Sequence, residues 1–129
     1  QGLIEVEQRD GKVFVTVGSG GAFPSGTADL TEEAQRIMDR IALTAMSPDS
    51  SITVTGHTDD VPISNGQFRD NWDLGAGRAA SVVQAIQNTG LISGDRMSAV
   101  SKGEMAPLAD NNTAAGREQN RRIEIEISY

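Results

Sequence analysis

The 129-residue chain contains no cysteine and only one histidine, at position 57. The absence of cysteine excludes disulfide bonds and thiolate metal sites, and it leaves the cellular compartment open. Aromatic residues make up 4% of the chain. No apolar run approaches the roughly 20 residues that a membrane-spanning helix needs. A chain of this length is expected to form one domain, residues 1–129, with a core of its own.

The chain also has fewer basic residues than acidic residues. The chain has 11 lysine and arginine residues against 18 aspartate and glutamate residues, a formal charge of −7. This balance argues against a general binder of nucleic acid or of an anionic membrane surface, because such binders need a basic face. We therefore expect no nucleic-acid partner, although a local basic pocket is compatible with an acidic envelope.

The N-terminal quarter of the chain predicts a hairpin followed by a loop. Apolar and polar residues alternate over residues 4–17, and Asp10-Gly11 interrupts the alternation with a typical hairpin turn. The glycine-rich segment 18–28 lacks the lysine and the spacing of a phosphate-binding loop. It is expected to be a flexible connection that lets Phe23 turn inward.

Two helices are predicted from apolar residues spaced three and four apart, over residues 30–46 and 74–89. Asp29 with Glu32 resembles a capping box for the first helix, and Thr31 is a competing cap.

The second helix contains Gly75 and Gly77, and each glycine costs roughly 1 kcal/mol against alanine in a helix. Either the first turn frays there, or the backbone approaches a ligand closely. Gly90 supplies a C-terminal stop.

Three further strands and a short helix complete the expected elements. Residues 52–55 form a central strand, residues 97–101 a strand with Val100 inward, and residues 123–127 an alternating terminal strand. Residues 114–120 are expected to be a brief helix.

The densest polar cluster lies between the central strand and the second helix. Chemically versatile side chains follow the end of the strand and return at the start of the helix, where loops are exposed on a rigid scaffold. In order, the segments are Gly56-His57-Thr58-Asp59-Asp60, the loop 60–70, Asn71-Trp72-Asp73-Leu74 and Arg78.

These motifs resemble the OmpA-like peptidoglycan-binding domain. The matching residues occur in the family's order and cover the C-terminal two thirds of the chain: Gly56-His57-Thr58-Asp59, Asn71, Leu74, Arg78, Ala79, Gly116-Arg117 and Asn120-Arg121-Arg122-Ile123-Glu124. The segments Asp59–Ile63 and Asn71–Leu74 and the long loop 60–70 resemble the MotB/PomB branch, the B subunits of flagellar motor stators. The resemblance implies an α+β fold, a two-layer sandwich in which a mixed β-sheet carries helices packed on one face.

The resemblance also implies a binding site for the peptidoglycan stem peptide. It assigns Asp59 and Arg78 to the two ends of a zwitterionic amino-acid centre, such as the free centre of diaminopimelate. A carboxylate accepts hydrogen bonds from an ammonium group, and a guanidinium group binds a carboxylate through two parallel bonds. Further contacts are expected from Asn71, Thr58, Leu74, Arg122, Phe23 and Ala22.

Structural roles compete with these ligand contacts. Asp59 and Arg78 could form a scaffold salt bridge, Asn71 could cap the second helix, and Leu74 could only fill the core. Arg122 could pair with a nearby glutamate.

His57 raises the alternative of a metal-dependent hydrolase of wall peptides, with Asp59 and Asp60 as further ligands. A catalytic zinc site takes three protein ligands, usually with more than one histidine, and the chain has no G-x-S-x-G motif for a serine nucleophile. We therefore expect no catalysis, no metal and no cofactor.

The expected function is a cell-wall anchor for a flagellar motor stator. The chain begins at Gln1 without a signal peptide, which is expected of a fragment or a mature domain. The resemblance implies a periplasmic domain of a bacterial inner-membrane protein that forms a homodimer and contacts the stator A subunit through an absent membrane segment. The alternative is a general envelope anchor of the outer-membrane lipoprotein or porin type.

Overall fold

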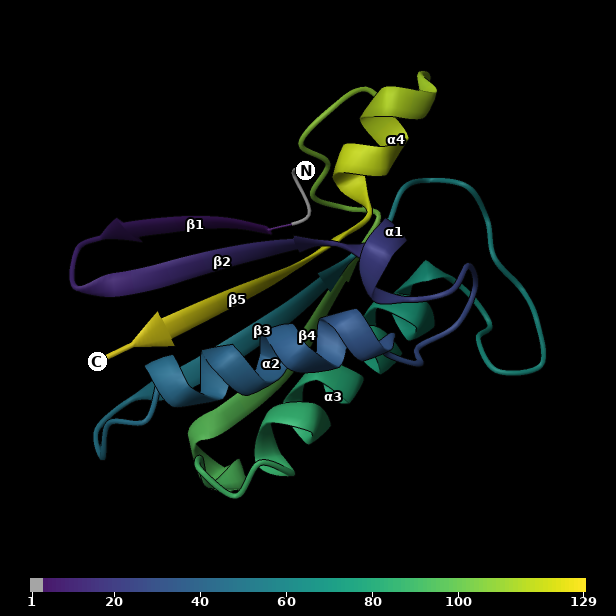
Figure 1. Cartoon of the computed structure of the whole chain (residues 1–129). Helices are drawn as coiled ribbons and strands as arrows, with labels where there is room; N and C mark the ends of the chain where they lie inside the picture. Colours follow the sequence, from purple (N-terminus) through teal and green to yellow (C-terminus); the bar gives the residue numbers. More distant parts are fainter. Residues whose placement is uncertain (1–3) are drawn as a thin grey trace.

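The structure is a computed structural model that describes residues 4–129. A five-stranded mixed β-sheet carries two long helices, α2 and α3, on one face (Figure 1). This arrangement confirms the predicted α+β fold. The strands are β1 (Ile4–Arg9), β2 (Lys12–Gly18), β3 (Ser51–His57), β4 (Met97–Gly103) and β5 (Arg122–Ser128); the helices are α1 (Ser19–Ala22), α2 (Glu32–Thr44), α3 (Asn71–Gln87), the 3-10 helix η1 (Gly94–Arg96) and α4 (Ala114–Asn120).

The strand order is β1-β2-β5-β3-β4, so the C-terminal strand lies in the middle of the sheet. Neighbouring strands are antiparallel except for β3 and β4, which are parallel. The two strands are joined through α3, as a parallel connection requires.

The predicted hairpin is confirmed. β1 and β2 pair along their whole length, and the turn between them is Asp10-Gly11. Both turn residues have positive φ, 56° for Asp10 and 75° for Gly11, which is the geometry that favours Asp-Gly.

The core lies between the helices and one face of the sheet. The alternation in β5 places Ile123, Ile125 and Ile127 on this face, each 1% exposed. They pack with the apolar faces of α2 and α3, whose buried residues include Met38 and Ile86. Apolar burial of this kind contributes about 25 cal/mol per Å² and dominates the stability of the fold.

The prediction that Val100 faces inward is wrong, because Val100 is 38% exposed. In the parallel ladder Val100 is paired with Thr55, and Ala99 is paired with the buried Val54. Because successive side chains of a strand point to opposite faces, Val100 lies on the face away from the helices.

Two expectations near the first helix are also corrected. Segment 18–28 is not entirely loop, because it contains the short helix α1. The N-cap of α2 is Thr31, whose hydroxyl accepts a hydrogen bond from the backbone N–H of Ala34, so the Asp29 capping box does not form. Phe23 turns inward as predicted and is 3% exposed.

The glycines of α3 serve helix packing. A Cβ on Gly56 of β3 would lie 2.1 Å from the carbonyl oxygen of Gly75, and a Cβ on Gly77 would lie 2.9 Å from the ring of Phe68. Gly75 therefore lets α3 approach β3 at backbone contact. Fraying is not the reason for these glycines, because α3 is helical from Asn71 onward.

Candidate functional site

An open cavity of about 740 Å³ lies where β3 ends and α3 begins, bordered by α1, loop 61–65 and α4. It brings together Phe23, Thr58, Asp59, Asn71, Leu74 and Arg78, six of the eight residues predicted to bind ligand. Its other charged residues are Arg117 and Arg121.

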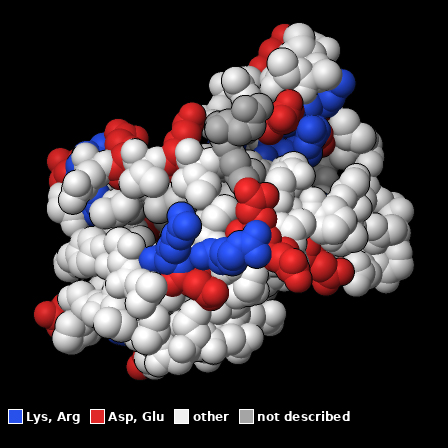
Figure 2. Space-filling model, in the orientation of Figure 1, with Lys and Arg blue, Asp and Glu red and all other residues white. Residues whose placement is uncertain are grey.

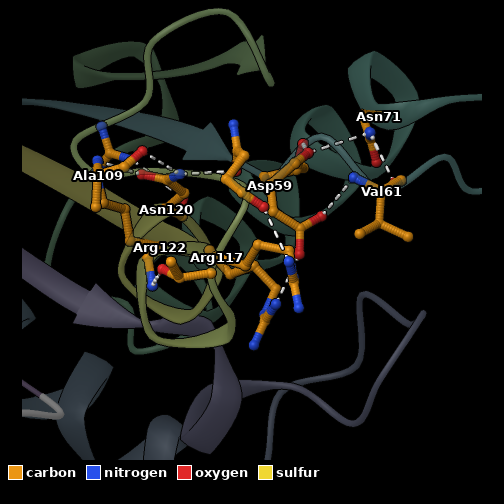
Figure 3. A network of polar contacts seen from close by, with 12 residues as sticks. Asp59, Val61, Asn71, Ala109, Arg117, Asn120 and Arg122 are labelled. Atoms are coloured by element: carbon orange, nitrogen blue, oxygen red, sulfur yellow. Dashed lines mark hydrogen bonds and ion pairs between the residues drawn. The ribbon is translucent and has the colours of Figure 1, made fainter.

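Asp59 lies two residues after the end of β3 and is 7% exposed. One carboxylate oxygen, Oδ1, accepts a hydrogen bond from the backbone N–H of Val61 at 3.0 Å. The other, Oδ2, forms an ion pair with Nη1 of Arg121 at 2.6 Å. Figure 3 shows the carboxylate of Asp59 directed towards the backbone N–H of Val61. The competing expectation of a direct Asp59–Arg78 salt bridge is therefore not met.

Arg78 lies on α3 and is 5% exposed. Its Nε donates to the carbonyl oxygen of Thr27 at 2.7 Å, and its Nη2 donates to that of Pro24 at 3.4 Å. The guanidinium carbon lies 4.8 Å from the centre of the Phe23 ring, within cation–π range. These contacts fix the guanidinium group in the cavity wall and leave other N–H donors for a ligand.

Burial lowers the pKa of Arg78 to about 10. The nearby positive charge of Arg121 contributes to this lower pKa, and the negative charge of Asp59 acts in the opposite direction. The negative charge of Asp59 therefore does not fully balance the positive charge of Arg78 in the cavity.

Asn71 supports the loop that carries Asp59. Its Nδ2 group lies 3.3 Å from the carbonyl oxygen of Asp59, 3.1 Å from that of Val61 and 2.9 Å from Oε1 of Glu104. The expected capping role is wrong, because Asp70 caps α3 by accepting a hydrogen bond from the N–H of Asp73. The hydroxyl of Thr58 likewise donates to the carbonyl oxygen of Asp59, at 2.7 Å.

Leu74 and Phe23 give the cavity its apolar surface, since both line it and both are buried. Ala22 does not line the cavity; it is 1% exposed and belongs to the core.

Arg122 does not line the cavity either. Its guanidinium group donates to Glu124 at 2.7 Å and to the carbonyl oxygens of Asn120 and Ala106, both at 3.0 Å. The competing expectation of a pair with a glutamate is confirmed.

Arg121 occupies the place in the cavity that the sequence assigned to Arg122. Arg121 is the C-cap of α4, and Arg122 is the first residue of β5. Neighbouring residues in extended backbone point to opposite sides, so only one of the two can reach the cavity. Arg117, four positions before Arg121, was also missed, and the i, i+4 spacing was the available signal.

Asn120 holds the segment 108–111 against α4 (Figure 3). It is fully buried, and its Oδ1 accepts hydrogen bonds from the N–H groups of Leu108 and Ala109 at 2.7 and 2.9 Å. Its Nδ2 donates to the carbonyl oxygen of Ala109 at 3.0 Å and to Oδ1 of Asn111 at 2.8 Å. All four hydrogen-bonding positions of the amide are thus used.

His57 does not line the cavity and is 5% exposed. Its Nε2 lies 3.3 Å from Oε1 of Glu124, in an orientation that does not satisfy hydrogen-bond geometry. The imidazole of His57 and, after it, the guanidinium of Arg122 lower the pKa of Glu124 to about 2, against the opposing effect of burial. Over residues 4–129, no group of three histidine, aspartate or glutamate side chains is arranged to hold a metal ion.

The surface around these elements is mixed in charge. On the face shown in Figure 2, acidic side chains are scattered, and basic side chains gather over α2 and beside α4. None of the helices within residues 4–129 is long and apolar enough to cross a membrane.

The known sequences to which this chain is similar include two bacterial proteins. Motility protein B of Bacillus subtilis is 32% identical over 125 residues, which cover 96% of this chain and 48% of that protein. The peptidoglycan-binding protein ArfA of Mycobacterium tuberculosis is 33% identical over 108 residues, which cover 83% of this chain and 32% of that protein. This chain therefore spans less than half the length of either relative.

Solved structures show the same fold. The cell wall anchor of the T6SS from Pseudomonas aeruginosa superposes with a TM-score of 0.90 and 32% identity, over 98% of this chain and 87% of that chain. The periplasmic domain of Helicobacter pylori MotB superposes with a TM-score of 0.86 and 26% identity, over 97% of this chain and 81% of that chain. The OmpA family matches residues 22–121, which include every charged side chain of the cavity. The chain therefore belongs to the OmpA family.

Proposed function

We propose that this domain binds the stem peptide of diaminopimelate-type peptidoglycan non-covalently and without catalysis. The observation that carries the proposal is that Asp59 and Arg78 line one open cavity without being bonded to each other. A carboxylate and a guanidinium group that line one cavity are complementary to the ammonium and carboxylate groups of an amino-acid centre. Leu74 and Phe23 supply apolar surface for the aliphatic part of the ligand.

Binding at a single site is expected to be weak. A small zwitterion offers few atoms with which to overcome the entropy of association, and its ammonium must replace Arg121 at the carboxylate of Asp59. Several domains tethered to one wall network would raise the overall strength through effective concentration.

The biological role that we propose is anchoring of a flagellar motor stator to the wall, from the periplasmic side of the inner membrane. Its support is the similarity to motility protein B over 96% of this chain and to the periplasmic domain of H. pylori MotB. A homodimer and contact with the stator A subunit through a membrane segment are part of the same proposal.

A sedimentation assay tests wall binding. Purified diaminopimelate-type sacculi are incubated with the wild-type domain and with Asp59→Asn and Arg78→Lys, and the pelleted fraction is measured. Both variants are expected to lose at least about nine tenths of the binding, because each removes one charged or bidentate contact. Asp60→Asn, an exposed neighbour outside the cavity, is the matched control and should bind as wild type does.

Circular dichroism and thermal melting establish that the variants remain folded. Retention of wall binding by folded Asp59→Asn and folded Arg78→Lys would defeat the proposal.

A general envelope anchor is the second candidate, supported by the TM-score of 0.90 to the cell wall anchor of the T6SS. Both roles use the same wall chemistry, so they differ only in what is anchored. Deleting the gene in the source bacterium separates them: loss of swimming with an intact envelope supports the stator, and envelope defects with normal swimming support the general anchor.

A further inference from the structure

The cavity carries more positive charge than a zwitterion can balance. Its lining contains three guanidinium groups, those of Arg78, Arg117 and Arg121, and one carboxylate, that of Asp59. Its formal charge is therefore +2, although the whole chain carries −7. A cluster of like charges in a concave, partly desolvated site attracts ligands of the opposite charge.

The guanidinium groups occupy two separate walls. Arg78 comes from α3 and is bonded to the backbone of residues 24–27. Arg117 and Arg121 come from α4 and its C-cap, four residues apart and therefore on one side of the helix. Arg117 lines the same cavity as Asp59, and its Nη1 donates to the carbonyl oxygen of Asn111 at 2.9 Å.

A bound zwitterion would leave the α4 wall unbalanced. Its carboxylate would pair with Arg78, and its ammonium would take the carboxylate of Asp59 away from Arg121. Arg121 would then have no counter-charge. It would still lie near Arg78, and the positive charge of Arg121 lowers the pKa of Arg78. A second carboxylate on the ligand would restore the balance.

We propose that the cavity recognises a ligand with two carboxylates around one ammonium, and that Arg117 and Arg121 are the specificity-determining residues for the second carboxylate. This inference rests on the proposed function and narrows its ligand to stem peptides whose second carboxylate is not amidated. Amidation replaces the negatively charged carboxylate by a neutral amide whose NH₂ group donates hydrogen bonds. The guanidinium groups of Arg117 and Arg121 are also donors, so they cannot pair with that NH₂ group.

Two carboxylates of the stem could fill this position. One is the α-carboxylate of the D-glutamate that precedes diaminopimelate, and the other is the diaminopimelate carboxylate remote from the free ammonium. Isothermal titration calorimetry distinguishes them with three synthetic tripeptides: L-Ala-γ-D-Glu-meso-diaminopimelate, and the same peptide amidated at one or the other of these two carboxylates. Wild type is expected to bind one amidated form about tenfold more weakly than the parent, because a charge-assisted contact is lost.

Arg117→Gln is the informative variant, because it leaves the Asp59–Arg121 ion pair intact. Arg117→Gln is expected to bind the parent tripeptide about as weakly as wild type binds the amidated form that lacks the second carboxylate. In this variant, the affinities for the parent and for that amidated form should differ by less than about twofold. Arg36→Gln, which removes an exposed arginine from α2 outside the cavity, should behave as wild type does.

Each outcome decides a different question. Wild-type affinities within about twofold for all three tripeptides, with binding abolished by Asp59→Asn, would overturn the second-carboxylate inference and leave the proposed function standing. An amidation effect that persists unchanged in Arg117→Gln and in Arg121→Gln would overturn the assignment of these two residues. Failure of wild type to bind any of the tripeptides would overturn both proposals.

Discussion

The carboxylate of Asp59 forms its ion pair with Arg121, at 2.6 Å, although Arg78 lines the same cavity. Arg121 therefore occupies the acceptor that the ammonium of the proposed ligand would use. If the proposed function holds, binding exchanges the ionic partner of Asp59, and such an exchange is sensitive to the salt concentration.

We expect binding to diaminopimelate-type sacculi to weaken as salt rises from about 0.05 M to about 0.5 M, because salt screens charges across an open cavity. The pelleted fraction at a series of salt concentrations measures the effect. Any residual binding of Asp59→Asn should change less with salt than that of wild type. A salt-independent wild type would contradict the exchange at Asp59.

At the backbone contact between α3 and β3, we expect Gly56 to tolerate no side chain. Gly56→Ala is expected to lower the free energy of unfolding by about 2–3 kcal/mol, because the new Cβ would overlap the carbonyl group of Gly75. Urea denaturation provides the measurement. Gly66→Ala is the control, since a Cβ on Gly66 meets no atom within 4 Å; equal stability of the two variants would refute the packing explanation.

Asn120 is expected to be important for stability although it lies outside the cavity lining. Asn120→Ala leaves the N–H groups of Leu108 and Ala109 without their acceptor and should cost about 3 kcal/mol. The measurement is the midpoint of urea unfolding, and the exposed Asn112→Ala serves as the control. A loss below about 1 kcal/mol would mean that water replaces the amide.

Glu124 should contribute to the acid sensitivity of the fold. Its pKa lies at about 2 in the folded state, below the ordinary value of 4.5 for a glutamate, so its contribution is present above about pH 4.5 and is lost as pH falls towards 2. The contribution is reduced by solvent, because the side chain is 42% exposed.

Glu124→Gln is therefore expected to lower stability at neutral pH and to flatten the decline in stability between about pH 4.5 and pH 2. Urea midpoints across this range, for wild type and the variant, test the expectation. Glu126→Gln is the matched control on the same strand, because its partner Lys12 is 44% exposed, whereas the partners of Glu124, His57 and Arg122, are buried. Parallel pH profiles for wild type and Glu124→Gln would count against the prediction.

Periodicity and turn chemistry predicted most of the scaffold. Alternating isoleucines identified β5, the Asp-Gly turn identified the β1–β2 hairpin, and residues 114–120 form a helix as expected. Val100 was misplaced because a short apolar pattern does not fix which side of an edge strand faces the helices.

Local choices between adjacent residues were the hardest to predict. Asp70 and not Asn71 caps α3, and Arg121 and not Arg122 reaches the cavity. In each pair both side chains have suitable chemistry, and only the direction of the backbone at the element boundary decides between them. The partner of Asp59 comes from 62 residues further along the chain, a contact that no local pattern encodes.

The position of Asp59 at the end of β3 has a mechanical consequence. β3 is hydrogen-bonded to β4 on one side and to β5 on the other, whereas β1 has β2 as its single neighbour. Tension between the cavity and the N-terminal side of the domain would therefore detach β1 first and leave the strand below Asp59 intact. The six residues of β1 span about 20 Å when extended, and single-molecule pulling would register the release of this strand as a separate early step, before the region around Asp59 unfolds.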